Sequence, residues 1–266
     1  MQLNGRHVVV TGAAGGIGAA LAARFHAAGA RVTLSDIAAP GVESVASRLE
    51  ARRPDSAHAV AADVATDDGN ARLITAAERR FGPIDLFFAN AGVAIGRDPM
   101  SPEAEWDLAF DVNVHAHRWA ARHLLPGWLE RGDGYFCSTA SAAGLLSQIG
   151  SAPYSLTKAA AVAFAEWLSI TYGDRGLKVS CLCPQGVNTA MLNGGVADVG
   201  ASVVRAAGNV LEPAQVADIV HDAIVDERFL ILPHPEVQQF RERKASDPER
   251  WLAGMRKLQA RMLGAS

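Results

Sequence analysis

The 266-residue sequence lacks the features that mark several special classes of protein. It contains no run of eighteen or more apolar residues, so we expect no transmembrane span. Its first residues show no basic region followed by an apolar one, as a signal peptide would. The formal net charge is −3, whereas a dedicated nucleic-acid binder needs a basic face. We therefore expect a cytoplasmic protein that binds neither membranes nor nucleic acid.

Cysteine is scarce as well. The three cysteines, Cys137, Cys181 and Cys183, lie in apolar runs typical of strands, and an odd number gives no disulfide framework. We expect no metal site. Linkers, repeats and low-complexity tracts are also absent. The sequence therefore predicts one domain over residues 1–266, in which residues 236–266 form a C-terminal helical extension.

What the sequence does contain is a regular alternation of short β-branched runs and longer Ala-rich segments. The pattern predicts strands at residues 7–11, 31–35, 58–62, 84–90, 134–139, 178–184 and 229–233, and helices at residues 17–29, 41–53, 68–81, 102–132, 152–173 and 213–226. Strands that are apolar on both faces and separated by helices form a parallel sheet covered on two sides. The predicted fold class is α/β: a doubly wound, Rossmann-like parallel sheet of about seven strands with helices on both faces.

A glycine-rich segment stands at the end of the first strand, and ligands of such sheets bind beyond the carboxyl ends of the strands. The segment TGAAGGIG (residues 11–18) follows that strand and opens the first helix. Gly12, Gly16 and Gly18 lack a Cβ atom, which allows a tight turn and brings a pyrophosphate close to the helix N–H groups. An ordinary strand-to-helix turn is the alternative, because the spacing differs from the G-x-G-x-x-G fingerprint.

Asp36 follows the second strand and indicates which dinucleotide would bind. A carboxylate there accepts hydrogen bonds from the adenosine ribose hydroxyls and repels a 2′-phosphate. Ala14 and Ile37 offer no positive charge for that phosphate, so the sequence favours NAD over NADP. The alternative is a surface aspartate that caps the next helix. ADV (62–64) and NAG (90–92) end the third and fourth strands, within reach of the adenine amine and the cofactor backbone.

Tyr154 and Lys158 stand four residues apart in a predicted helix and therefore share one face. A free phenol has a pKa of about 10, so action as a base near pH 7 needs a shift of about 3 units, or roughly 4 kcal/mol. Charges about 4 Å apart interact by about 4 kcal/mol at an effective dielectric of about 20, so a nearby ammonium can supply much of this. A packing phenol beside a snorkelling amine is the alternative for the pair taken alone.

Two more polar residues point to the same chemistry. Ser141 follows the fifth strand and can donate its hydroxyl to a substrate oxygen while Tyr154 exchanges the proton. Asn113 falls on the packed face of a predicted helix, where a buried amide must be hydrogen-bonded. In this order, TGAAGGIG, NAG, Asn113, Ser141 and YSLTK (154–158) resemble the compact, single-domain branch of the short-chain dehydrogenase/reductase family. The resemblance covers about residues 5–233.

The resemblance implies a catalytic tetrad of Asn113, Ser141, Tyr154 and Lys158. Tyr154 would be the general base in oxidation and the general acid in reduction, while Ser141 holds the reacting oxygen. Lys158 would bind the nicotinamide ribose and lower the pKa of the phenol. Asn113 would anchor a water that relays protons to Lys158. The cofactor-binding residues that we predict are Gly12, Gly15, Gly16, Ile17, Gly18, Asp36, Ile37, Asp63, Val64, Asn90, Ala91, Gly92, Tyr154, Lys158, Pro184, Val187 and Thr189.

The family's P-G-x-x-x-T run, whose threonine meets the nicotinamide amide, occurs here as PQGVNT (184–189) with Gln185 in place of the first glycine. The family places its substrate contacts in segments that correspond to residues 145–153 and 190–210. Gly194, Gly195 and Gly200 predict a mobile loop there. No arginine cluster in these segments demands an anionic substrate. The candidate substrate contacts are Gln148, Gln185 and Met191, in a partly apolar pocket with Leu145, Leu146, Ile149 and Leu192; a lid packed on the core is the alternative.

The tail predicts a further helix. Residues 248–263 place Trp251, Met255, Leu258 and Met262 on one stripe, which subunit or core packing explains better than membrane binding. The helices at residues 102–132 and 152–173 resemble those that form four-helix contacts between subunits in this family. We therefore expect a homotetramer, or failing that a dimer.

The sequence as a whole predicts an NAD-dependent oxidoreductase that interconverts a secondary alcohol and a ketone, with that small molecule as its partner. Two alternatives remain. One is a non-enzymatic, NAD-sensing regulator on the same fold, and the other is a carbonyl reductase that prefers NADPH.

Overall fold

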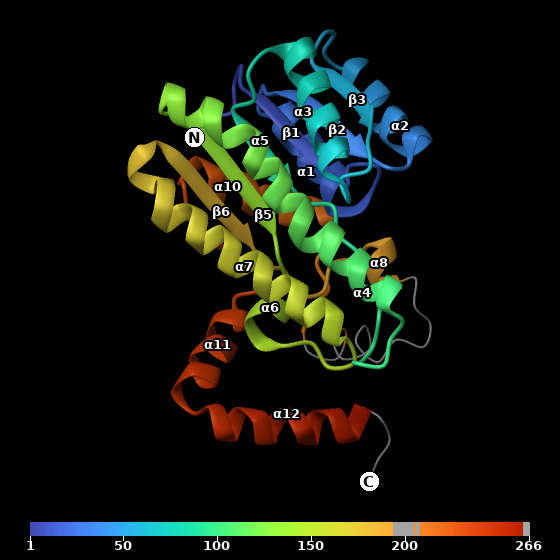
Figure 1. Cartoon of the computed structure of the whole chain (residues 1–266), viewed down its shortest axis with the longest axis vertical. Coiled ribbons are helices and arrows are strands. Elements are labelled where there is room, and N and C mark those ends of the chain that lie inside the picture. The colour runs from blue at the N-terminus through green and yellow to red at the C-terminus, as the bar shows by residue number, and fades with distance from the viewer. Residues whose placement is uncertain (194–204, 206–207, 263–266) are drawn as a thin grey trace.

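Seven parallel strands form one sheet in the order β3-β2-β1-β4-β5-β6-β7 in the computed structural model, which describes residues 1–193, 205 and 208–262 (Figure 1). The strands are β1 (His7–Thr11), β2 (Arg31–Asp36), β3 (Ala57–Ala61), β4 (Leu86–Ala89), β5 (Gly134–Thr139), β6 (Leu177–Leu182) and β7 (Leu230–Ile231). The chain builds the sheet outward in one direction from β1 and in the other from β4. The strand order therefore reverses between these two strands, which is where doubly wound sheets bind ligands.

The predicted fold class is confirmed, and all seven predicted strands are present. Three are shorter than predicted. β6 ends at Leu182 rather than at residue 184. β4 begins at Leu86 rather than at residue 84, because the Ile84 carbonyl accepts a hydrogen bond from Trp128 Nε1 at 2.7 Å and a second one from Arg131. β7, at the edge of the sheet, has only two residues of the predicted 229–233.

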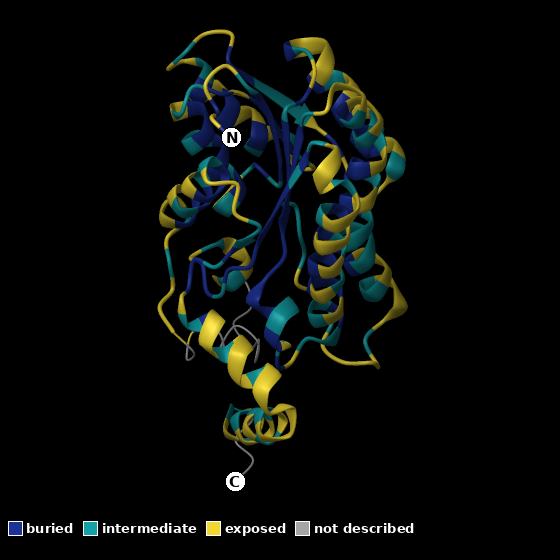
Figure 2. Cartoon of the chain, turned by 90° about the vertical axis from the view of Figure 1, so that its left-hand side faces the viewer, coloured by how far each residue is buried: buried dark blue, intermediate teal, exposed yellow. Residues whose placement is uncertain are grey.

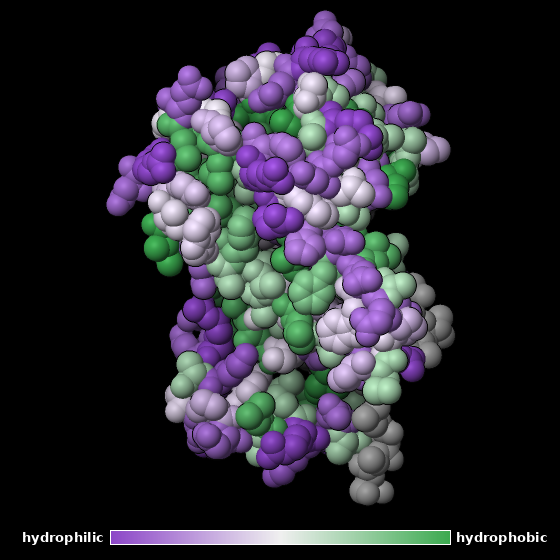
Figure 3. All heavy atoms as spheres, viewed as in Figure 1, coloured by the Kyte–Doolittle hydropathy of each residue, from purple (hydrophilic) through white to green (hydrophobic). Residues whose placement is uncertain are grey.

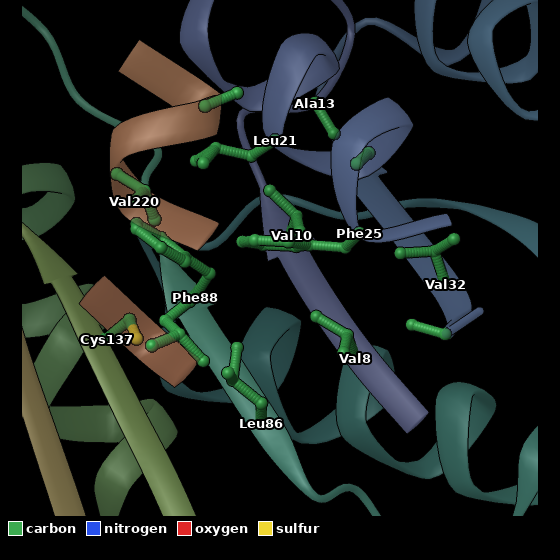
Figure 4. Close-up of a cluster of buried hydrophobic side chains, with 14 of the residues drawn as sticks. Val8, Val10, Ala13, Leu21, Phe25, Val32, Leu86, Phe88, Cys137 and Val220 are labelled. Atoms are coloured by element: carbon green, nitrogen blue, oxygen red, sulfur yellow. The ribbon is translucent and has the colours of Figure 1, made fainter. Parts of the chain in front are cut away.

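Three helices cover one face of the sheet: α1 (Gly16–Ala27), α2 (Ala39–Glu50) and α10 (Pro213–Val225). Alternate strand residues point toward them, so Val8 and Val10 of β1 pack in one cluster with Phe25 of α1 and Val220 of α10 (Figure 4). Full burial of such a side chain contributes about 1.5–3 kcal/mol.

The opposite face is covered by α3 (Asp67–Phe81), α5 (Ala116–Arg131) and α7 (Ala152–Tyr172). Val9 of β1 and Phe136 of β5 point to this side, where they join Leu73 of α3 and Ala161 of α7. Figure 2 shows the buried sheet between the two helical layers. Because both faces are buried, the strands need the continuous apolar runs seen in the sequence.

The helix predicted over residues 102–132 contains an irregular turn at its centre. It is divided into α4 (Glu103–Phe110), a π-helical turn (Asp111–His115) and α5. The turn carries Asn113, whose side chain is fully buried and bonded to the backbone of Val93. The predicted end is confirmed, since Gly132 stops α5 in a left-handed conformation with φ +65°.

Short and C-terminal helices complete the part of the chain that the structure describes, together with a 3₁₀ turn at Gly173–Arg175. α6 (Ala142–Leu146) follows β5, and α8 (Ala190–Asn193) follows the PQGVNT turn. The predicted C-terminal extension contains α11 (Glu236–Ser246) and α12 (Pro248–Met262). The predicted mobile loop with Gly194, Gly195 and Gly200 lies outside the described residues.

α12 lies at one end of the molecule, away from the sheet (Figure 1). None of its described residues is buried, and Trp251 meets Phe240 of α11 with 6.4 Å between the ring centroids. The predicted stripe of Trp251, Met255, Leu258 and Met262 is therefore only half-buried. No described helix is long and apolar enough to cross a membrane. All three cysteines are buried free thiols.

Candidate active site

A cleft of about 660 Å³ opens at the carboxyl ends of the central strands. It contains the predicted glycine-loop residues, Asp36, the NAG segment, Ser141, Tyr154, Lys158 and the PQGVNT turn. The predicted substrate contacts Gln148, Gln185 and Met191 line it as well. The predicted site residues that line the cleft are Gly12, Gly15, Gly16, Ile17, Gly18, Asp36, Asn90, Ala91, Gly92, Ser141, Gln148, Tyr154, Lys158, Pro184, Gln185, Val187, Thr189 and Met191.

Four predicted residues do not line the cleft. Ile37 is 74% exposed on the surface, and Asp63 and Val64 lie away from the cleft at the end of β3. Asn113 is fully buried behind the cleft wall. Position after a strand is therefore not a sufficient signal for a place in the cleft.

The glycine loop is packed too tightly for side chains at two of its positions. A Cβ atom on Gly18 would lie 2.1 Å from the Gly12 carbonyl oxygen, and one on Gly12, whose φ is +65°, would lie 2.9 Å from Ala91 Cα. Gly15 differs, because nothing lies within 4 Å of its Cβ position. Gly15 precedes α1 and offers no side chain to cap it. The loop thus leaves open space directly beside the N-terminal N–H groups of a helix, which suits a phosphate.

Asp36 faces this loop. Its two carboxylate oxygens accept hydrogen bonds from the backbone N–H groups of Ala14 and Ala38, each at 3.0 Å. Each oxygen keeps a further lone pair for a ribose hydroxyl. Asp36 therefore joins the glycine loop to the start of α2 and lines the cleft as well, so it is more than a surface cap.

Asn90 of the NAG segment links three strands. Its Nδ2 donates to the Thr11 carbonyl at 3.0 Å, and its Oδ1 accepts from Thr139 Oγ1 at 3.0 Å. Thr11 Oγ1 in turn accepts from the backbone N–H groups of Asn90 and Ala91. The ends of β1, β4 and β5 are thereby held together at the edge that carries the site.

Tyr154 and Lys158 share one face of α7, as the spacing predicted. Lys158 Nζ lies 5.7 Å from the centroid of the Tyr154 ring. The ammonium is only 2% exposed and donates to the Thr139 carbonyl at 2.9 Å. Ser141 Oγ accepts from the Ala143 N–H at 3.1 Å and donates to the Pro184 carbonyl at 3.4 Å. Phenol, ammonium and hydroxyl thus meet in one part of the cleft.

The pKa values of this pair follow from burial. Burial raises the pKa of the Tyr154 phenol, a contact with Ser141 offsets part of the rise, and the nearby Cys183 adds to it. Burial also lowers the pKa of Lys158 to about 8. The shift of Tyr154 is opposite to the expectation drawn from the family resemblance, in which Lys158 lowers the pKa of the phenol. The phenol is therefore protonated at neutral pH.

Asn113 supports the site from behind. Its Oδ1 accepts from the Val93 N–H at 2.9 Å, and its Nδ2 donates to the Val93 carbonyl at 2.9 Å and to Thr157 Oγ1 at 3.0 Å. The prediction that this buried amide is hydrogen-bonded is confirmed. A Cβ atom on Gly92 would lie 3.2 Å from both Asn113 Oδ1 and Lys158 Nζ, so these two atoms flank one small space.

The PQGVNT turn lines the cleft although Gln185 stands where the family has a glycine. The buried side chain of His234, just after β7, accepts from the Gln185 N–H through Nδ1 at 3.1 Å. Its Nε2 donates to the carbonyls of Gly186 and Asn209, each at 3.1 Å. Thr189 reaches the glycine loop, since its Cγ2 lies 3.2 Å from the Cβ position of Gly16. Gln185 Oε1 is buried without a hydrogen-bond partner among the described residues.

Sequence reasoning missed part of the cleft wall. Ala94, Ile95, Gly96 and Arg97 line it from the loop after NAG, a segment without a motif. Of the apolar residues predicted for the pocket, Leu192 lines it. Leu145, Leu146 and Ile149 do not, and the first two pack instead against Val237 of α11, as the lid alternative describes. Among the described residues no group of three His, Cys, Asp or Glu side chains could hold a metal ion.

Comparison with known proteins agrees with this geometry. Residues 6–199 match the family described as short chain dehydrogenase. The chain belongs to the short-chain dehydrogenase/reductase family. It is similar to 1-deoxy-11-beta-hydroxypentalenate dehydrogenase of Streptomyces avermitilis, with 37% identity over 90% of this chain and 88% of the relative. It is also similar to cis-4-hydroxycyclohexanecarboxylate dehydrogenase of Sinomonas cyclohexanicum, with 31% identity over 81% of this chain and 87% of the relative.

Among solved structures, the fold is similar to that of a short-chain dehydrogenase/reductase from Burkholderia phymatum in complex with NAD. The TM-score is 0.86 and the identity 27%, over 94% of this chain and 96% of that one. As a short-chain dehydrogenase/reductase, the protein is an NAD(P)-dependent oxidoreductase that acts on hydroxyl and ketone groups. The alternative of a non-enzymatic regulator is thereby set aside.

Proposed function

We propose that the protein interconverts a secondary alcohol and a ketone with NAD as cofactor, and that Tyr154 is its general acid and base. The observation that carries the proposal is the meeting of the Tyr154 phenol, Ser141 and buried Lys158 in the same cleft as the open glycine loop. A proton-transfer group and a nucleotide cradle are the two parts that hydride-transfer chemistry requires.

The residues present fit a dinucleotide. The free space beside Gly15 and the adjacent N–H groups of α1 suit the pyrophosphate, and Asp36 suits the adenosine ribose. Neither Ala14 nor Ile37 brings a cation to that ribose, which supports NAD over NADP. The further cofactor contacts that we propose are those predicted above, apart from the three that lie outside the cleft. The nicotinamide, when bound, accepts or supplies the hydride.

The side chains divide the remaining work. Because its pKa is raised, Tyr154 is protonated at neutral pH and can donate to a carbonyl oxygen in reduction. Ser141 holds that oxygen through its hydroxyl. Lys158 binds the nicotinamide ribose, and Asn113 anchors a water that relays protons toward Lys158. In oxidation Tyr154 must first lose its proton, so oxidation should accelerate as the pH rises above neutrality.

The two relatives are named for substrates that carry a hydroxyl group on a ring system, and we propose a cyclic secondary alcohol or the matching ketone here too. Ile95, Met191 and Leu192 give the cleft an apolar wall for such a ring, and Gln148 and Gln185 supply polar contacts.

We also propose a homotetramer, or a dimer, located in the cytoplasm. Leu156, Trp167 and Ile170 of α7 are exposed, and Figure 3 shows hydrophobic residues on the face that α7 covers. Exposed apolar patches of this kind mark subunit contacts. The molar mass in solution, measured by light scattering, checks this assembly.

Replacement of Tyr154 by Phe tests the function. Tyr154→Phe should lower turnover of a cyclic secondary alcohol by about 10²- to 10⁴-fold, because proton transfer is lost. NAD affinity, read from tryptophan fluorescence, should change little. The matched control is Tyr172→Phe, which alters a phenol at the other end of α7. Undiminished turnover in Tyr154→Phe would refute the role, and a higher kcat/KM with NADPH than with NADH in the native protein would favour the NADPH-dependent alternative.

A further inference from the structure

One cation in the cleft has no part in the proposed mechanism. Three charged side chains line the described part of the cleft: Asp36, Lys158 and Arg97. Asp36 lies beside the glycine loop, and Lys158 is buried against Thr139. Arg97 lies at the other end, where its carbonyl accepts from the N–H of Ala152, two residues before Tyr154. The substrate end of the cleft therefore carries one unassigned positive charge.

The backbone at Arg97 is held firmly in place. Its N–H donates to Ser101 Oγ at 2.8 Å, and its carbonyl accepts from Ala152 at 2.9 Å. The carbonyl of Gly96 accepts from Ser151 Oγ at 2.9 Å. Gly96 has φ +74°, and a Cβ atom on it would lie 2.7 Å from Pro153 Cγ. The loop thus packs directly on the first turn of α7, which fixes the origin of the Arg97 side chain relative to Tyr154.

The guanidinium of Arg97 has no acidic partner among the described residues. Two acids lie near it in the chain or in space. Asp98 Oδ1 accepts from the Met100 N–H, and Glu105 Oε2 lies 3.5 Å from the Cβ position of Gly96. Neither forms an ion pair with Arg97 in the described structure. Its five N–H donors are therefore available to a ligand.

We propose that the substrate carries a carboxylate, and that Arg97 binds it at the mouth of the cleft while Tyr154 and Ser141 hold the reacting oxygen. This rests on the proposed function, since it places the substrate at those two residues. The planar guanidinium pairs with a carboxylate through two parallel hydrogen bonds, which fixes the orientation as well as the affinity. Ile95, Met191 and Leu192 line the same cleft and offer an apolar surface for the rest of the substrate, while Arg97 is exposed at the mouth. Arg97 is the one guanidinium that lines the described part of the cleft, which matches a single carboxylate; the nearby Arg205 donates instead to the Leu192 carbonyl at 2.7 Å.

Binding provides a test that does not depend on turnover. Cyclohexanecarboxylate and its uncharged amide are compared by calorimetry, with and without NAD, for the native protein, Arg97→Met, Arg97→Lys and Arg79→Met. Arg79 is an exposed arginine of α3 outside the cleft and serves as the control. The native protein should bind the carboxylate about 10-fold more tightly than the amide, and Arg97→Met should abolish that preference. Arg97→Lys should keep part of it, and Arg79→Met all of it.

Kinetics separates failure of this inference from failure of the proposed function. With 4-hydroxycyclohexanecarboxylate as substrate, Arg97→Met should raise KM about 10-fold and leave kcat nearly unchanged, whereas its values for the methyl ester should match those of the native protein. Equal affinity of the native protein for carboxylate and amide, or equal losses for acid and ester in Arg97→Met, would overturn the role of Arg97. Absence of turnover with all three of acid, ester and cyclohexanol would count against the proposed function, while the binding comparison would still decide the role of Arg97.

Discussion

Lys158 is a buried cation whose position lowers the stability of the fold, and we propose that it is kept for its part in the reaction. Its ammonium is 2% exposed and has the Thr139 carbonyl as its hydrogen-bond acceptor among the described residues. Removal of an ammonium from water is unfavourable, which is why burial lowers its pKa to about 8. The unfolded chain binds a proton at this site up to a pH of about 10.4. Between these two values the unfolded state holds more protons, so this site makes the native protein more stable as the pH rises.

We predict that Lys158→Met stabilises the fold and abolishes turnover. At pH 7 the free energy of unfolding should increase by roughly 1–3 kcal/mol, because an apolar side chain replaces a desolvated charge. The gain should shrink from pH 8 to pH 10. Urea denaturation at pH 7 and at pH 9.5 measures both effects. Lys178→Met, which removes a half-buried lysine of β6 that is paired with Glu227, is the control and should show no such gain. A variant less stable than the native protein at pH 7 would contradict the prediction.

At the residue scale, positions could be read from the sequence more reliably than their electrostatics. The four-residue spacing placed Tyr154 and Lys158 on one face, and the place after β2 put Asp36 in the cleft. The direction of the Tyr154 pKa shift could not be read, because it depends first on burial of the phenol in the folded protein. Arg97 was not predicted, because only the contacts of its loop with α7 bring it to the cleft.

At the scale of elements, His234 shows how one side chain can hold a turn whose sequence departs from its family. It pairs with the N–H of Gln185 and with the carbonyls of Gly186 and Asn209. Its Nδ1 accepts a hydrogen from a backbone amide, so the ring is neutral with the proton on Nε2. Two segments far apart in the sequence are thereby joined beside the cleft.

We predict that His234→Leu loosens this turn. Loss of the imidazole removes the partner of the Gln185 N–H and of the Asn209 carbonyl, while the Gly186 carbonyl keeps its bond from the Leu211 N–H. This should cost about 1–3 kcal/mol of stability. Thr189 lies against the glycine loop, so a looser turn should raise KM for NAD about 3- to 10-fold. An effect of this size is no larger than that expected for the loss of one hydrogen bond. Thermal unfolding and cofactor kinetics measure the two effects, with Gln238→Leu on exposed α11 as the control. An unchanged KM for NAD would show that His234 does not hold the turn.

The elements themselves were predicted best where their periodicity is strong. Short β-branched apolar runs predicted the seven strands, and the longer Ala-rich segments between them predicted the helices. The π-helical turn at Asp111–His115 could not be predicted, because it accompanies hydrogen bonds between Asn113 and the backbone of Val93. These bonds join segments that are distant in the sequence. α6 escaped prediction because its five residues are too few to show a helical period.

At the scale of the whole molecule, α11 packs on α6 through the buried Val237, whereas α12 stands apart from the body that holds the site. α12 has no buried residue in its described length, and its ring contact is with α11. A helix that buries as little surface as α12 adds little to the stability of the protein. The apolar stripe of α12 is half-exposed. The sequence predicted that this stripe packs against the core or against another subunit, and it did not decide between the two.

We predict that deletion of residues 248–266 leaves the domain folded. The melting temperature should fall by less than about 4 °C, since about 1 kcal/mol or less of packing is lost from a domain of this size. Turnover by the native and shortened proteins should agree within a factor of about two. Circular dichroism and light scattering are measured together, and a decrease in molar mass would assign the stripe of α12 to subunit packing. Loss of the folded state on deletion would contradict the prediction.

The buried thiols of β5 and β6 have a practical consequence. Cys137, Cys181 and Cys183 are shielded from solvent, and the Sγ atoms of the last two are 3.8 Å apart on the strand beside Lys158. A thiol reagent in bulk water can react with them only when this half of the molecule opens. The rate at which such a reagent reacts would therefore measure how often this half of the molecule opens, and no engineered label would be needed.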